Sequence, residues 1–158
     1  MQRNDYRRTV IMLRSMRNGY SGHARLEQRT LMGDLFVNAS MPQTEGVPHV
    51  TLAGMRHGRW YAADAGTLRR DARGQAAGRF HFDPRNVSGR DMDEYALVLI
   101  TLPEEPDTGI VLSGNLRSAQ VDWAAMREAV RRLYHKDSPD VTALPDAAAA
   151  ENTATSDE

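Results

Sequence analysis

The feature that most constrains the fold is an alternation of apolar and polar residues with a period of two. Phe80 and Phe82 alternate with polar neighbours, and segments 24–29, 34–38 and 49–55 follow the same rule. Successive side chains of a β-strand point to opposite faces, so this alternation is typical of strands with one buried face. Glycine, proline and aspartate separate the segments at short intervals. We therefore predict a mainly β fold, an antiparallel β-sandwich or partly open barrel of about 7–9 short strands.

Two tight connections indicate hairpins. His57 and Gly58 form a two-residue link between two predicted strands, and glycine supplies the positive φ that such a turn needs. Residues 72–74 form a second link of three residues that ends in glycine, which is typical of a hairpin with a left-handed final residue.

Residues 95–102 break the alternation because they are apolar on both faces except at Thr101. Something must cover the outer face of this strand. The sequence offers a helix over 122–135, with Asp122 as the N-cap, packed on the sheet near that strand. One side of this helix carries the apolar residues Trp123, Met126, Val130, Leu133 and Tyr134. A second subunit that covers the same face is the alternative.

Composition divides the chain into one domain and a tail. Of its 158 residues, 1–137 suffice for a single β-rich domain that includes the C-terminal helix. Residues 138–158 carry almost no large apolar side chains, so we predict a disordered acidic tail. The segment from Asp137 onward contains six acidic and no basic residues, whereas 1–136 contain all 20 basic residues.

The sequence lacks the motifs of several kinds of metal site and catalytic site. The chain has no cysteine, and its five histidines show no metal-binding spacing, so we expect no metal and no cofactor. No motif of a hydrolase, metalloprotease or nucleotide-binding loop is present, so we expect a protein that is not an enzyme. Asp91, Asp93 and Glu94 form an acidic cluster that fits a solvated turn better than a calcium loop.

Charge and hydropathy limit the kinds of partner that the sequence makes plausible. All but one of the basic residues are arginine, which can serve nucleic-acid binding, but no RNA-binding aromatic motif accompanies them, so nucleic acid is an unlikely partner. No segment approaches the roughly 18 apolar residues of a membrane span, and no signal-like apolar region begins the chain. We expect a soluble, cytoplasmic domain whose partner is an unknown protein or a second copy of the chain.

Trp60 and Tyr61 follow the first hairpin turn, and adjacent strand residues point to opposite faces. One of the two rings then faces away from the core, beside Arg56 and Arg59. These four residues are the candidate interaction surface, suited to a protein or glycan contact. The alternative is that a neighbouring loop covers the outer ring.

Three stretches resemble a known kind of domain: YSGHARLEQRTLMGDLFV, AADAGTLRRDARGQAAGRFHFDPRNVSGRDMDEYALVLIT and GIVLSGN. They resemble an uncharacterised β-sandwich domain of clostridial-type bacterial proteins. More remotely, their layout is similar to the extracytoplasmic domain of membrane anti-sigma factors, with Ala65, Gly66, Asp71 and Gly74 at the matching turns. The chain lacks the membrane span and sigma-binding helices of those factors, so sigma regulation is not carried over. The resemblance implies a binding or structural module and names no site.

These observations together favour a non-catalytic β-sandwich module that mediates protein–protein interaction or assembly. A module that binds a small ligand or a glycan is the alternative.

Overall fold

The computed structural model describes residues 6–42, 46–105 and 109–135. The predicted tail, 138–158, and the predicted domain end at residue 137 lie outside these residues. The strands are β1 (Arg7–Ser15), β2 (Ser21–Gln28), β3 (Gly33–Ser40), β4 (His49–Arg56), β5 (Arg59–Thr67), β6 (Arg69–Arg70), β7 (Gln75–Phe82), β8 (Tyr95–Thr101) and β9 (Ile110–Asn115). A 3₁₀ turn, η1 (Met92–Glu94), precedes β8, and a helix, α1 (Trp123–Tyr134), follows β9.

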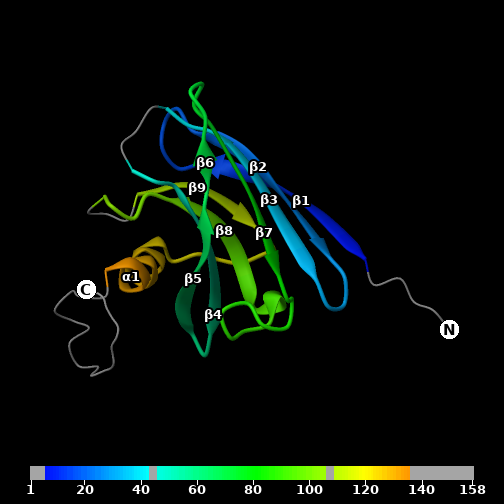
Figure 1. The fold of residues 1–158 in the computed structure, drawn as a ribbon. Coiled ribbons are helices and arrows are strands. Elements are labelled where there is room, and N and C mark those ends of the chain that lie inside the picture. Colours follow the sequence, from blue (N-terminus) through cyan, green and yellow to red (C-terminus); the bar gives the residue numbers. More distant parts are fainter. Residues whose placement is uncertain (1–5, 43–45, 106–108, 136–158) are drawn as a thin grey trace, which may run out of the picture.

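The strands form one antiparallel sheet in the order β5-β4-β8-β9-β1-β2-β3-β7-β6. This sheet folds over on itself, so that the half made of β1, β2, β3 and β7 faces the half made of β4, β5, β8 and β9 (Figure 1). The predicted fold class is confirmed: the molecule is a nearly closed antiparallel β structure with one C-terminal helix.

The main core lies between the two halves and follows the period of two. On β2 and β3 the inward residues pair directly, Ala24 with Val37 and Leu26 with Leu35, and all four are buried. Their chain neighbours point outward and are half-buried or exposed. Alternation in the sequence therefore marks the inner face of this half correctly.

Both predicted hairpins are confirmed. Arg56 pairs with Arg59 across His57 and Gly58, whose φ angles of 54° and 76° are those of the primed turn that suits the twist of a hairpin. In the second hairpin, the backbone N–H of Asp71 donates to the carbonyl of Gln75 at 2.9 Å across residues 72–74.

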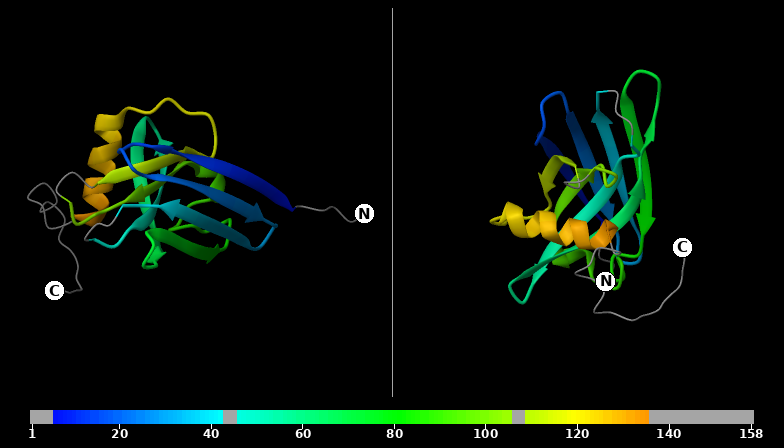
Figure 2. Two further views of the ribbon diagram at one scale, coloured as in Figure 1. Left: turned by 90° about the horizontal axis from the view of Figure 1, so that it is seen from above. Right: turned by 90° about the vertical axis from the view of Figure 1, so that its left-hand side faces the viewer.

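The outer face of β8 is covered by α1, as the sequence predicts. Figure 2 shows the helix lying across the outside of the β4–β5–β8 half. Leu97 and Leu99 of β8 form a second buried cluster with Met126 and Val130 of the helix. The carboxylate of Asp122 accepts hydrogen bonds from the first free backbone N–H groups of the helix, at 3.1 and 3.2 Å, so it is the N-cap.

One residue of the predicted apolar stripe is misplaced. Leu133 is half-buried and belongs to neither buried cluster, whereas Ala129, which the stripe omits, is only 3% exposed. Because α1 crosses the strands instead of running along them, its fully packed residues lie in the middle turns, and Trp123 and Tyr134 at its two ends are only partly buried against the same cluster.

Polar contacts fix the last turn of α1. The hydroxyls of Tyr134 and Thr51 lie 2.8 Å apart, and the hydroxyls of Thr51 and Thr101 lie 3.0 Å apart. Both threonines are fully buried, and burial raises the pKa of Tyr134. Thr101, the one polar residue in an otherwise apolar strand, therefore belongs to a hydrogen-bonded group beneath the helix.

Within the described part of the chain, no helix has both the length and the apolar character that crossing a membrane requires.

Candidate functional site

β1 is paired along most of its length on one side and only at its end on the other. Residues from Arg7 to Leu13 pair with β2, but only Arg14 and Ser15 pair with β9. In the described residues no other strand pairs with β1. From Arg8 to Met12, the edge of β1 that faces β9 is therefore open, although β1 lies in the middle of the strand order.

The register identifies which residues turn their backbone groups to this open edge. The N–H of Met16 donates to the carbonyl of Val111 at 2.9 Å, and Arg14 pairs with Ser113, so residues of this parity face β9. Every second residue of an antiparallel strand faces the same neighbour. Hence Arg8 and Val10 direct backbone groups at the open edge, whereas the carbonyl of Met12 lies against Gly114 of β9.

Gly114 lies where β9 crosses β1 and then leaves it. A Cβ at this position would lie 2.5 Å from Cγ2 of Ile11 and 2.8 Å from Cδ2 of Leu13, so only glycine allows the close crossing. Past this point the chain follows β8, since the N–H of Leu116 donates to the carbonyl of Ala96 at 2.7 Å. The two strands separate as a consequence, and a groove opens between them.

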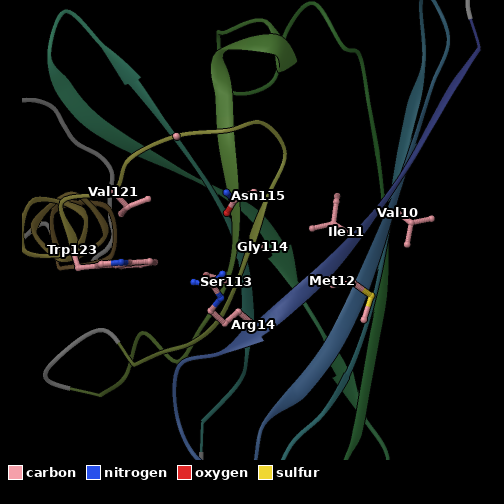
Figure 3. A pocket seen from close by; sticks show the side chains of 10 residues that line it. Val10, Ile11, Met12, Arg14, Ser113, Gly114, Asn115, Val121 and Trp123 are labelled. Atoms are coloured by element: carbon pink, nitrogen blue, oxygen red, sulfur yellow. The ribbon is translucent and has the colours of Figure 1, made fainter.

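The groove has a volume of about 500 Å³. Figure 3 shows it between β1, which carries Val10 and Met12, and the start of α1, where Val121 precedes the helix and Trp123 is its first residue. The end of β9 lies between these two walls, at Ser113 to Asn115 (Figure 3). We call this space the β1 groove.

Two apolar side chains on β1 are unusually exposed. Val10 is 59% and Met12 is 73% exposed, although their neighbours Ile11 and Leu13 are buried in the core. Natural edge strands are protected by charges, proline or bulges, because an apolar open edge invites pairing with another chain. Among the described residues nothing covers this apolar pair.

The charge around the β1 groove is positive. Arg8 and Arg14 are exposed on either side of the apolar pair, and neither forms an ion pair with any residue that the structure describes. β1 contains no acidic residue. Two acidic residues lie near this strand, and both are paired with other arginines. Glu27 of β2 is opposite Arg8 in the register and lies 2.7 Å from Arg25, and Asp93 is shared by Arg7 and Arg117, at 3.7 and 3.8 Å.

The four residues of the predicted interaction surface do not form one surface. Trp60 is only 5% exposed, because it lies in the cluster beneath α1. Tyr61 points to the opposite face, where its hydroxyl donates to the carbonyl of Glu94 at 2.8 Å. Trp60 is therefore covered, by a helix and not by the loop that the sequence left open as the alternative, and Tyr61 is half-buried. Arg56 and Arg59 are exposed, without an exposed aromatic ring beside them.

The acidic cluster next to η1 is held as a turn. The carboxylate of Asp91 accepts from the N–H of Asp93 at 3.0 Å and caps η1. Glu94 lies 3.9 Å from Arg56 and 3.6 Å from Arg90. Across residues 6–42, 46–105 and 109–135, no group of three His, Asp or Glu side chains is arranged to hold a metal ion.

Sequence reasoning missed β1 both as a strand and as a site. Its run Val10-Ile11-Met12-Leu13 is apolar at both parities, so it gives no alternation. That run was the available signal, because an apolar residue on the outer face of a strand must be covered either by the fold or by a partner.

The chain matches no known family model, and no curated protein matches it in sequence. The resemblance to a clostridial-type β-sandwich domain therefore stays a prediction.

Proposed function

We propose that this protein is a non-catalytic interaction module that binds an extended segment of a partner protein along the open edge of β1. The observation that carries the proposal is the coincidence of unpaired backbone groups and exposed apolar side chains, Val10 and Met12, on one strand edge. An added strand would gain main-chain hydrogen bonds from the edge and specificity from alternate side chains.

The charge of β1 favours a partner of a particular chemistry. A strand added beside Arg8 to Met12 would place apolar side chains opposite Val10 and Met12 and an acidic side chain near Arg8. Pairing of two copies is less favourable, because antiparallel pairing about Ile11 would set Arg8 of one copy opposite Arg14 of the other. We therefore propose a different protein as the partner, with an extended segment that has alternating apolar residues flanked by acids.

A synthetic peptide tests this chemistry. The probe is acetyl-Asp-Thr-Leu-Thr-Leu-Thr-Asp-amide, titrated into ¹⁵N-labelled protein and followed by NMR. We expect saturable shifts at the amides of Arg8, Val10 and Met12. The control peptide, with lysine in place of both aspartates, should bind at least about ten-fold more weakly. Equal binding of both peptides, or shifts confined to other strands, would contradict the proposal.

Val10→Pro separates binding from folding. The N–H of Val10 faces the open edge, so proline removes a donor to the partner without removing a bond to β2. We expect at least about a ten-fold loss of peptide affinity with little change in melting temperature. If the variant is unfolded, a probe that carries N-methyl groups on its leucines gives the same test on native protein. Sedimentation that reveals a dimer abolished by Val10→Pro would refute the choice of partner, because it would show that a second copy occupies the open edge.

A further inference from the structure

A second cavity lies on the other side of the molecule, at the seam where the sheet does not close. β6 pairs only with Ala76 and Ala77, so the rest of β7 has an open edge that faces β5. The cavity occupies about 250 Å³ at this seam. Its inner wall consists of the buried side chains of Leu35, Leu52 and Met92.

Two phenylalanines leave this space unfilled because they lie against backbone. A Cβ at Gly66 would lie 2.7 Å from Cε1 of Phe80, and a Cβ at Gly33 would lie 2.6 Å from Cζ of Phe82. Each ring thus occupies the space that a side chain would take at the facing glycine, on β5 for Phe80 and on β3 for Phe82. The rings line the cavity with their remaining surface, and the volume between them and the core leucines stays open.

The rim of the cavity is polar and acidic. Asp64 and Asp83 lie there with Asn86 and Ser88. The carboxylate of Asp64 accepts from the N–H of Gly66 at 3.0 Å and lies 3.2 Å from Nδ1 of His49. Asp83 is oriented by the backbone N–H of Arg85 at 2.9 Å, which keeps its pKa below the usual range. The side chain of Arg85 also lies 3.5 Å from this carboxylate, so Asp83 stands beside a guanidinium and Asp64 beside an imidazole.

We propose that this cavity is a binding site for a small aromatic or alicyclic molecule of one or two rings that carries no negative charge. An apolar cavity of about 150 Å³ lined by leucine, isoleucine and phenylalanine is large enough for benzene, so the present volume admits one further ring. An apolar interior with a few convergent polar groups at the mouth is the usual form of such a site. Among the described residues Asp64 has no guanidinium partner, so its carboxylate disfavours an anionic ligand. The site is separate from the β1 groove and needs no partner protein.

Three related probes test the size and charge of the ligand. Indole, tryptamine and indole-3-carboxylate are titrated into protein with ¹³C-labelled methionine methyl groups. We expect saturable shifts of the Met92 methyl with indole and tryptamine. The carboxylate should bind at least about ten-fold more weakly. Absence of saturation, shifts at methionines other than Met92, or equal binding of the carboxylate would overturn the assignment.

A filling variant locates the binding. Ala65 lines the cavity, so Ala65→Leu should occupy it and reduce indole affinity at least about ten-fold. Ala77→Leu adds the same side chain at an exposed position of β7 and should leave affinity unchanged. If Ala65→Leu does not fold, Asp64→Asn provides a second test, because it should reduce the discrimination against the carboxylate probe. Undiminished indole binding in Ala65→Leu, or unchanged discrimination in Asp64→Asn, would refute the proposal.

Discussion

Truncation of Met126 measures how strongly α1 is bound to the sheet. Met126 is fully buried against the outer face of β8, in the same cluster as Leu97 and Leu99. Met126→Ala removes a large apolar side chain and leaves a cavity between helix and strand. Substitutions of this kind lower the free energy of unfolding by about 2–5 kcal/mol.

The position of each residue on the helix predicts a graded series. Val130, also fully buried, loses two carbons on truncation to alanine, which corresponds to about 1.5 kcal/mol of transfer free energy before any cavity effect. Leu133 is half-buried and outside both clusters, so Leu133→Ala should lower stability by only about 1 kcal/mol. Arg127 is exposed, and Arg127→Ala should change stability by less than about 0.5 kcal/mol.

Urea unfolding followed by circular dichroism gives these free energies, provided that the dependence on urea concentration is the same in all four variants. The expected order of destabilisation is Met126, Val130, Leu133 and Arg127. A loss for Leu133→Ala as large as that for Met126→Ala would refute the docking geometry. Mild effects throughout would mean that α1 is not part of the cooperative fold.

Three further predictions concern single polar groups. The hydrogen bond from Arg79 keeps the pKa of Asp34 below its usual value, so the ionised carboxylate stabilises the fold above about pH 4. Asp34→Asn should therefore destabilise the protein at neutral pH, as measured by urea unfolding. This destabilisation should disappear as the pH falls through the lowered pKa. Asp122→Ala removes the N-cap of α1 and should lower the free energy of unfolding by about 1 kcal/mol. Tyr134→Phe removes the hydroxyl that meets Thr51 and should lower it by about 1–2 kcal/mol in the same assay.

Matched variants control these predictions. Asp122→Asn keeps the capping oxygen and should restore most of the stability that alanine removes. Asp34→Asn would count against the assigned ion pair if its effect were the same at pH 3 and pH 7. In a double-mutant cycle, Tyr134→Phe and Thr51→Val should be strongly non-additive; additive effects would mean that the two hydroxyls do not act together.

The sequence determined the elements whose signals are local. The alternation around Phe80 indicates one strand and which of its residues lie on each face. The turn at Gly58 depends only on the backbone conformations of two residues. The N-cap of α1 is equally local, because an aspartate side chain reaches backbone N–H groups two and three residues ahead. The uniformly apolar β8 also predicted that something covers its outer face, since an apolar face without cover is unstable in water.

Tertiary structure alone decided which surfaces remain open. Whether Trp60 is exposed depends on where α1 crosses the sheet, and the direction of that crossing also placed Leu133 outside the buried clusters. The open edge of β1 exists because β9 separates from β1 at Gly114 and stays paired with β8. These two partners of β9 lie far apart in the chain. The seam cavity likewise depends on Phe80 meeting the backbone of Gly66 across two strands that do not pair. Binding surfaces of this kind are set by contacts between distant segments, and a local pattern in the sequence carries no record of which segments meet.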